Sequence, residues 1–174
     1  APKAELFING KSQGMREKSS DGNYLERYRL MWMDTRYEPG ELRVVAYDAD
    51  GNRVGEKTVR TAGKPDHLVL TPNRHEMKAD GEDLIYVTVQ VADKDGNIVP
   101  TDSREVHFDV KGAGRFRATA NGDATSLRQF HLPVMDLFSG AATVIVQASD
   151  IPGPVTLEAK AKGVKPAKLT LQTK

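Results

Sequence analysis

The sequence predicts an all-β fold, arranged as two immunoglobulin-like β-sandwich domains in tandem. Apolar residues recur with a period of two, as they do in strands that bury one face. Clusters of Gly, Pro, Asn and Asp interrupt these runs about every 8–12 residues, a spacing typical of sandwiches and barrels. The chain has 174 residues, of which 39% are hydrophobic and 28% charged, as expected for a globular protein with a buried core.

The clearest strand pattern lies in residues 84–92. Its odd-numbered residues, from Ile85 to Val91, are apolar and alternate with more polar neighbours, so they are expected to face the core. Residues 105–111 alternate in the same way, which predicts a strand with one solvated face. The same alternation predicts further strands at residues 69–70, 143–148, 155–159 and 168–172.

The first third of the chain shows shorter versions of this pattern. Asn9-Gly10 separates residues 6–8 from residues 11–15 and is a strong hairpin signal, because both residues tolerate positive φ. Pro39-Gly40 marks another turn, after which residues 42–47 alternate as a strand. Residues 24–35 fit both a helix face and an alternating strand, and a strand is favoured.

Small residues next to Gly63 and Pro65 predict a domain boundary. The expected domains are residues 1–62, a linker at 63–66, and residues 67–174. The second domain is close to the ~100 residues of an immunoglobulin-like sandwich. The first is short for independent stability and is predicted to lack its first strand.

Charge and cysteine content exclude several classes of function. The 25 Lys and Arg residues against 24 Asp and Glu residues give a net charge of +1, so neither nucleic acid nor a membrane is an expected partner. Cysteine is absent, which removes disulfides and thiolate metal sites. The first residues, Ala1 to Glu5, show no signal peptide or membrane span, which suggests a mature form or an excised fragment.

Two Asp-rich loops at residues 48–52 and 93–97 invite a calcium interpretation. Neither has the Gly at position six and Glu at position twelve of an EF-hand, so self-capped turns are favoured. The four histidines lack metal-ligand spacing. No metal site and no cofactor is predicted.

No catalytic residue is predicted either. The sequence has no GxSxG nucleophile elbow and no Gly-rich phosphate loop opening a helix. The neighbouring carboxylates Glu38 and Glu41, and Glu82 and Asp83, flank turn signals, where exposed carboxylates usually serve solvation.

The candidate sugar or domain contacts are Trp32, Tyr37, Asn121 and Asp123. Flat aromatic faces can stack on sugar C–H groups, although a lone Trp more often belongs to a core. Asn121 and Asp123 belong to the densest polar loop, at residues 121–126, for which a self-capped turn is favoured over a ligand contact.

Several segments, taken in order, carry a family resemblance. They are residues 5–12 (ELFINGKS), 37–42 (YEPGEL), 59–65 (VRTAGKP), 70–72 (LTP), 79–84 (ADGEDL), 95–97 (DGN) and 121–123 (NGD). Each is a common turn sequence, but their order and spacing resemble the C-terminal region of β-galactosidase-like enzymes of glycoside hydrolase family 2. The resemblance covers nearly the whole chain.

The resemblance implies that this chain is a set of immunoglobulin-like modules that follow a catalytic (β/α)₈ barrel. That barrel supplies both catalytic glutamates, so no catalytic residue carries over to this sequence, and the chain alone is not expected to be an enzyme. Its expected partners are the catalytic and upstream domains of the same parent chain, with a parent homodimer and carbohydrate as further partners. The expected location is the periplasm or the exterior of a bacterium.

The sequence leaves two functions open. One is a non-catalytic accessory region that buttresses or spaces the barrel; the other is a carbohydrate-binding module. The resemblance also places a strand with a tryptophan before the YEPG turn, which makes Trp32 structural.

Overall fold

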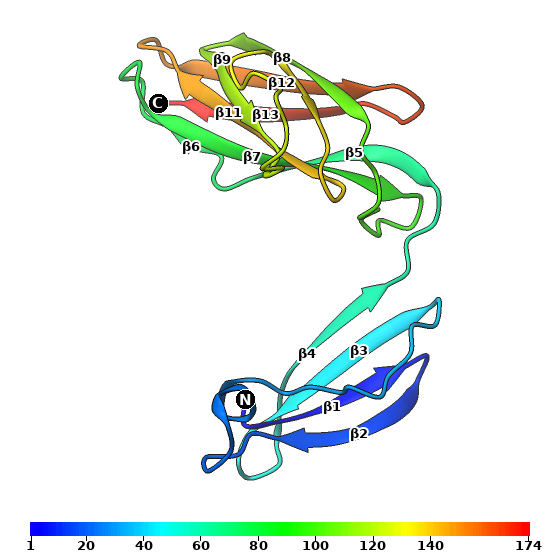
Figure 1. Cartoon of the computed structure of the whole chain (residues 1–174). Coiled ribbons are helices and arrows are strands. Elements are labelled where there is room, and N and C mark those ends of the chain that lie inside the picture. The colour runs from blue at the N-terminus through cyan, green and yellow to red at the C-terminus, as the bar shows by residue number, and fades with distance from the viewer. The chain divides into compact units, whose positions relative to one another are not determined.

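The computed structural model describes all residues 1–174 and divides into two compact units, residues 1–61 and 62–174. It contains thirteen strands and a single five-residue helix, which confirms the predicted all-β class (Figure 1). That helix has neither the length nor the apolar character of a membrane span.

The first unit contains a single antiparallel sheet with the strand order β2-β1-β3-β4. The elements of this unit are β1 (Lys3–Ile8), β2 (Lys11–Glu17), α1 (Tyr24–Tyr28), β3 (Glu41–Tyr47) and β4 (Arg53–Arg60). The predicted hairpin at Asn9-Gly10 is confirmed, with φ angles of 49° and 80°. The unit therefore has one sheet layer rather than the two layers of a complete sandwich.

The predicted strand over residues 24–35 is wrong. Residues 24–28 form α1, and the following residues up to β3 contain no strand. The helix begins there because Asn23 Oδ1 accepts hydrogen bonds from the backbone N–H groups of Leu25 and Glu26, while the Glu26 carboxylate accepts from the Asn23 N–H. This reciprocal arrangement is a capping box, which satisfies N–H groups that a helix start would otherwise leave unpaired.

Strand register divides the first unit's sheet into two chemically different faces, because directly paired residues point the same way. The apolar face holds Ala4 paired with Ala46, Leu6 with Val44, and Ile8 with Leu42. The opposite face carries the ion pairs Lys3–Glu17, Arg43–Glu56, Arg53–Glu56 and Arg60–Glu41. The ion-pair face also holds Phe7, Val45 and Tyr47, and Val45 is only 4% exposed, so the charged residues border an apolar centre on that side.

The chain between α1 and β3 covers the apolar face. Leu6 is only 6% exposed although the unit has no second sheet, so its cover must come from outside the strands. Figure 1 shows this part of the chain running across the strands. The cover is incomplete, because the cross-strand partners Leu42 and Val59 remain 43% and 57% exposed.

Gly40 joins three parts of the first unit. Its N–H donates to Thr61 Oγ1 at 3.0 Å, and its carbonyl accepts from the Thr61 N–H at 2.8 Å. Beside it, the Asn9 side chain accepts from the Glu41 N–H at 2.8 Å and donates to the Pro39 carbonyl at 3.1 Å. Three of the segments that carry the family resemblance therefore meet at the turn formed by residues 39–41.

The second unit is a sandwich of two sheets, with strand orders β10-β8-β12-β13-β6 and β5-β7-β11-β9. Its strands are β5 (Pro65–Pro72), β6 (Glu76–Met77), β7 (Leu84–Asp93), β8 (Glu105–Gly112), β9 (Gly114–Ala120), β10 (Val134–Asp136), β11 (Ala141–Ala148), β12 (Gly153–Ala161) and β13 (Ala167–Thr173). The pairings are antiparallel except that of β13 with β6. β5 begins at Pro65, so part of the predicted linker belongs to a strand.

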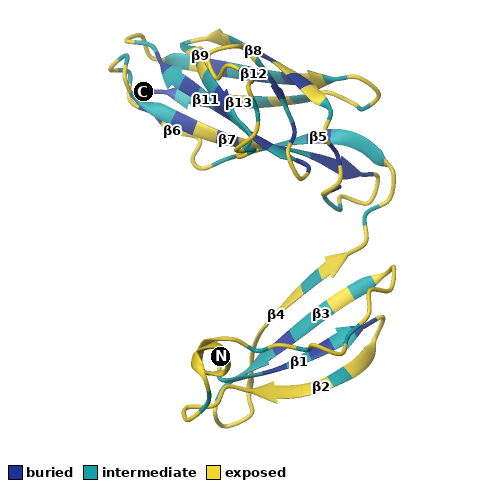
Figure 2. Cartoon of the chain, viewed as in Figure 1, coloured by how far each residue is buried: buried dark blue, intermediate teal, exposed yellow.

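The core of the second unit lies between its two sheets. Ile85, Val87, Val89 and Val91 of β7 are fully buried, as the alternation predicts, and Val106 and Leu157 reach the same core from the other sheet. Figure 2 shows this burial as dark blue bands that recur along the strands of the second unit. The predicted strands of the second domain are all present.

We predict that Gly40→Ala destabilises the first unit by about 3 kcal/mol, through backbone strain and steric overlap. Gly40 has a φ of 133°, and a Cβ there would lie 2.0 Å from Asn9 Oδ1. Urea unfolding followed by Trp32 fluorescence measures the change, because this tryptophan lies in the first unit and is the only one in the chain. Gly51→Ala is the control, since its added Cβ meets nothing within 4 Å and its positive φ costs about 1 kcal/mol. Equal losses in the two variants would contradict the proposed role of the Gly40 contact.

Candidate functional site

The predicted site residues are divided between the two units. Trp32 and Tyr37 belong to the first unit, whereas Asn121 and Asp123 belong to the second. Within the first unit, Trp32 contacts β2, and Tyr37 contacts Thr61, which lies just beyond β4. The strands β2 and β4 are the two edges of the sheet. The two rings therefore do not form a shared sugar platform.

Trp32 is half-buried and attached to the edge of the sheet. Its Nε1 donates to the Gly14 carbonyl of β2 at 2.9 Å, and its own carbonyl accepts from Thr35 Oγ1 at 3.0 Å. The first bond holds the covering segment against the sheet, and the second fixes the turn that follows Trp32 within the segment. The Trp32 side chain thus has a structural role, which is to attach the segment after α1 to β2.

Tyr37 presents most of its ring to solvent, with 78% of the residue exposed. Its hydroxyl lies 3.2 Å from Thr61 Oγ1, the atom that also accepts from the Gly40 N–H. The ring is therefore fixed at its polar end and accessible along its apolar body. This is the most accessible of the four predicted contact residues.

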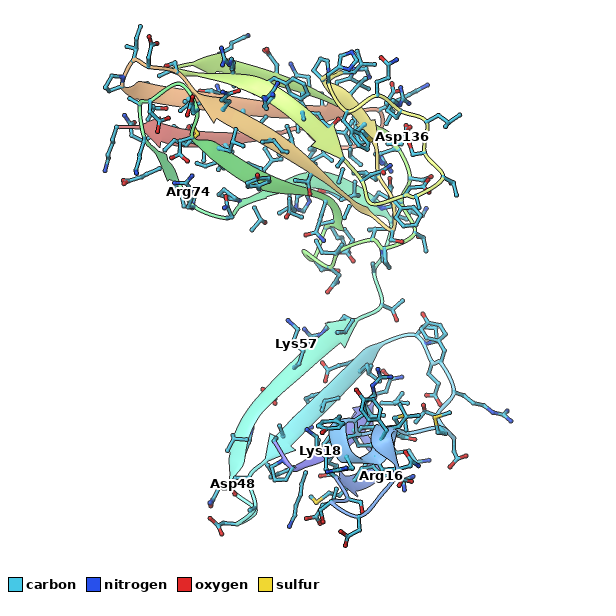
Figure 3. All side chains as sticks on the ribbon, turned by 60° about the vertical axis from the view of Figure 1, so that its left-hand side comes forward. Arg16, Lys18, Asp48, Lys57, Arg74 and Asp136 are labelled. Atoms are coloured by element: carbon cyan, nitrogen blue, oxygen red, sulfur yellow. The ribbon has the colours of Figure 1, made fainter.

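A groove of about 500 Å³ lies in the first unit between the end of β2 and the segment after α1. Its lining includes charges of both signs, among them Arg16, which Figure 3 labels, Glu17 and Asp34, together with Met31 and Met33. The structure contains no group of three His, Asp or Glu side chains that could hold a metal ion. The groove offers mixed polar contacts without a focused charge.

The polar loop of the second unit caps its own backbone. Asn121 Oδ1 accepts from the Asp123 N–H at 3.0 Å, and Asn121 Nδ2 donates to the Asp136 carbonyl at 3.0 Å. Asp123 Oδ1 accepts from the Thr125 N–H and Oγ1, and these bonds lower the pKa of the Asp123 carboxyl. Both predicted residues are thus occupied by bonds within the loop and to β10.

Arg128 connects the loop between β9 and β10, residues 121–133, to two strands of the neighbouring sheet. Its guanidinium Nη2 lies 2.7 Å from Asp136 Oδ2 of β10 and 2.8 Å from Glu105 Oε2 of β8. These carboxylates raise the pKa of Arg128, with Asp136 the larger cause. Next to this ion pair, Leu127 is 96% exposed.

One carboxylate of each neighbouring pair is engaged in an ion pair with an arginine. The Arg74 guanidinium, 2.5 Å from Asp83, and the Lys78 N–H lower the pKa of Asp83 to about 2. A general acid of a glycosidase needs a raised pKa, so Asp83 is suited to the opposite state. Glu41 is paired with Arg60 at 2.6 Å.

The two Asp-rich loops are turns capped by their own carboxylates. Asp93 is buried, and its oxygens accept hydrogen bonds from the N–H groups of Asp95, Asn97 and Gly63. These donors, with the Gly63 N–H first, lower its pKa. Asp48 accepts from the N–H and the side-chain amide of Asn52 in the same manner. The loop at residues 48–52 is a true hairpin, whereas the one at 93–97 leads only to a single bridge between Ala92 and Ile98.

Sequence reasoning missed the Arg128 ion pairs and the exposed apolar residues beside them. A signal was present, because Leu127, Phe130 and Leu132 are apolar residues in a segment without strand alternation. The pairing of Arg128 with Glu105 had no such signal, since the two residues are far apart in the sequence.

Comparison with known families places these features in context. Residues 68–170 match the family model described as glycoside hydrolase family 2 C-terminal domain 5. The chain belongs to glycoside hydrolase family 2. This confirms the resemblance drawn from the turn segments. Residues 1–55 match a second family model, described as a domain of unknown function, DUF4982.

Relatives within family 2 match the chain along nearly its full length. It is 37% identical over 171 residues to beta-galactosidase BoGH2A of Bacteroides ovatus, covering 98% of this chain and 19% of that protein. It is 27% identical over 172 residues to a beta-glucuronidase of Formosa agariphila, covering 97% of this chain and 17% of that protein. The chain thus spans less than a fifth of the length of these relatives.

Solved family 2 structures share the fold of the chain. A family member from Bacteroides cellulosilyticus matches with a TM-score of 0.85 and 29% identity, over 99% of this chain and 22% of that one. A beta-glycosidase from Bacteroides vulgatus matches with a TM-score of 0.87 and 25% identity, over 98% of this chain and 21% of that one.

We predict that Asp83→Asn flattens the acid dependence of stability of this family 2 domain. The folded-state pKa of Asp83 is lowered from 3.8 to about 2, so its stabilising contribution is present above pH 3.8 and is lost as the pH falls toward 2. Calorimetric Tm values between pH 5 and pH 2 should therefore fall less steeply in Asp83→Asn than in the unmodified chain. Asp150→Asn, which changes an exposed loop aspartate, is the control and should keep the original slope. Identical slopes in all three proteins would contradict the assignment.

Proposed function

We propose that this chain is a non-catalytic C-terminal accessory region of a β-galactosidase-like glycoside hydrolase, in which it buttresses or spaces the catalytic barrel. The observation that carries the proposal is the match of nearly the whole chain to under a fifth of BoGH2A, within a domain type named for its C-terminal place. The rest of such a parent is long enough to hold a (β/α)₈ barrel, which needs about 250 residues.

The chemistry of the chain's carboxylates supports this role. Asp83, Asp93 and Asp123 have lowered pKa values because N–H groups or a guanidinium donate to them. Glycoside hydrolysis needs one carboxylic acid that stays protonated and a second carboxylate across the scissile bond. Carboxylates that turns and ion pairs keep ionised stabilise the folded chain and are not suited to act as the general acid.

The parent's partners and location extend the same proposal. The accessory region contacts the catalytic and upstream domains of its own chain, and a parent homodimer is a further proposed assembly. The cysteine-free composition is compatible with the proposed location in the periplasm or outside the cell.

We predict that removing residues 1–174 from the parent enzyme lowers its temperature of half-inactivation by about 5 °C or more, because a buttressing contact is lost. The kcat of the shortened enzyme, measured well below that temperature on an aryl β-galactoside, should stay within about twofold of the parent value, since no reacting group is removed. Equal inactivation temperatures would contradict the accessory role. Turnover by the isolated chain that Glu82→Gln abolishes would support a hydrolase instead.

A second candidate function is carbohydrate binding, favoured by the exposed and anchored ring of Tyr37. An aromatic ring fixed at its hydroxyl can stack on the C–H face of a sugar at little entropic cost.

We predict for this second candidate that galactan in an affinity gel retards the chain and that Tyr37→Ala abolishes the retardation. Tyr28→Ala is the matched control, since Tyr28 is also exposed, at 61%, but its ring packs against that of Tyr24, with 5.2 Å between the centroids. Xylan and host-type glycans, run in parallel gels, test other sugar classes. No retardation in any gel would remove this candidate and leave the accessory role standing.

A further inference from the structure

The loop between β9 and β10, residues 121–133, combines internal rigidity with exposed apolar side chains. We infer that this loop is a docking element that inserts Leu127 and Phe130 into an apolar pocket elsewhere on the parent polypeptide. The inference rests on the proposed accessory role and deepens it by naming the contact surface.

The loop is ordered by many hydrogen bonds before any partner arrives. The Thr119 N–H of β9 donates to the Phe130 carbonyl at 2.7 Å, and Thr119 Oγ1 donates to the Leu132 carbonyl at 3.3 Å. The Ser126 N–H donates to the Asp123 carbonyl, and the Leu132 N–H to the Gln129 carbonyl. A loop held in this way loses little conformational entropy on binding.

Three apolar side chains are exposed on this ordered loop, beside the polar Gln129 and His131. Leu127 is 96% exposed, Phe130 58% and Leu132 36%, and all three lie between residues 127 and 132. Single exposed apolar residues are common on protein surfaces and need no explanation, but a group of them on a rigid loop is typical of an interaction site.

The charged groups of the loop are already paired within the domain. Arg128 is bound by Asp136 and Glu105, and Asp123 accepts from the Thr125 N–H and hydroxyl. The main electrostatic cost of forming an interface is the removal of water from unpaired charges. This loop has few such charges, so burying it against a partner costs little. The partner surface that fits best is therefore apolar.

These properties favour a protein pocket over a sugar. Sugar rings stack on flat aromatic faces, whereas the most exposed side chain here is the aliphatic Leu127. Arg128 is occupied by two carboxylates and is not free to hold an anionic sugar.

The size of the surface favours the parent chain over a second copy. A stable interface between separate proteins buries about 800 Å² on each partner, more than three side chains of one loop can supply. A segment of the same polypeptide meets the loop at a high effective concentration, so a small apolar contact is enough. The chain spans only 19% of BoGH2A, which leaves four-fifths of such a parent to provide the pocket.

Hydroxyl-radical footprinting with mass spectrometry tests the inference, because it reports the exposure of individual side chains. Oxidation of Leu127 and Phe130 should fall about fivefold in the intact parent relative to the isolated chain. Ile151, a lone exposed apolar residue at 67%, is the internal control and should keep its rate. Unchanged oxidation of Leu127 and Phe130 in the parent would overturn the inference.

A pair of variants provides an independent readout. Leu127→Ser should leave the Tm of the isolated chain unchanged, because the side chain is free in it, and should lower the Tm of the parent by about 4 °C. Ile151→Ser should be neutral in both proteins. A Leu127→Ser variant that is neutral in the parent would overturn the inference.

The same footprint separates the possible failures. Protection of other surfaces of the chain, without the loop, overturns the docking element and leaves the accessory role standing. Protection nowhere on the chain overturns both. Protection of the loop in the isolated chain that increases with concentration identifies a second copy as the occupant and overturns the choice of the parent polypeptide.

Discussion

A sheet with one apolar face is stable only when that face is removed from water, and this requirement organises both units. The second unit meets it with two sheets that bury each other's residues, including Val87 and Leu157. The first unit has one sheet, so an irregular stretch of chain takes the place of the second layer. Trp32 holds that stretch to β2 through a single hydrogen bond, which gives the tryptophan its structural importance.

Turns and their carboxylates account for much of what the sequence offers as candidate chemistry. Asp93, Asp123 and Asn121 satisfy backbone N–H groups within their own loops, and Arg128 joins a loop to two strands. Polar side chains used in this way fix the shape of a surface. The chemistry of that surface then depends on the residues left free, which here include the apolar Leu127 and Phe130.

The strands were predictable wherever burial follows a period of two, as at Ile85 and Val87. The helix α1 was also encoded locally, since Asn23 and Glu26 form a capping box, but the apolar pattern of the following residues favoured a strand instead. The contacts of Gly40 and Arg128 could not be predicted, because they join residues far apart in the chain. Thr61 lies 21 positions from Gly40, and no local periodicity reports such a pairing.

The Gly40 junction also bears on how the first unit is made on the ribosome. Asn9 and the Pro39-Gly40 turn leave the exit tunnel before Thr61, so a nascent chain that ends short of Thr61 leaves both backbone groups of Gly40 unpaired. The residue that follows β4 therefore completes a structure begun at the first hairpin. The first unit can complete these backbone hydrogen bonds only after residue 61 has left the ribosome, and β4, the last strand of its sheet, is likewise made last.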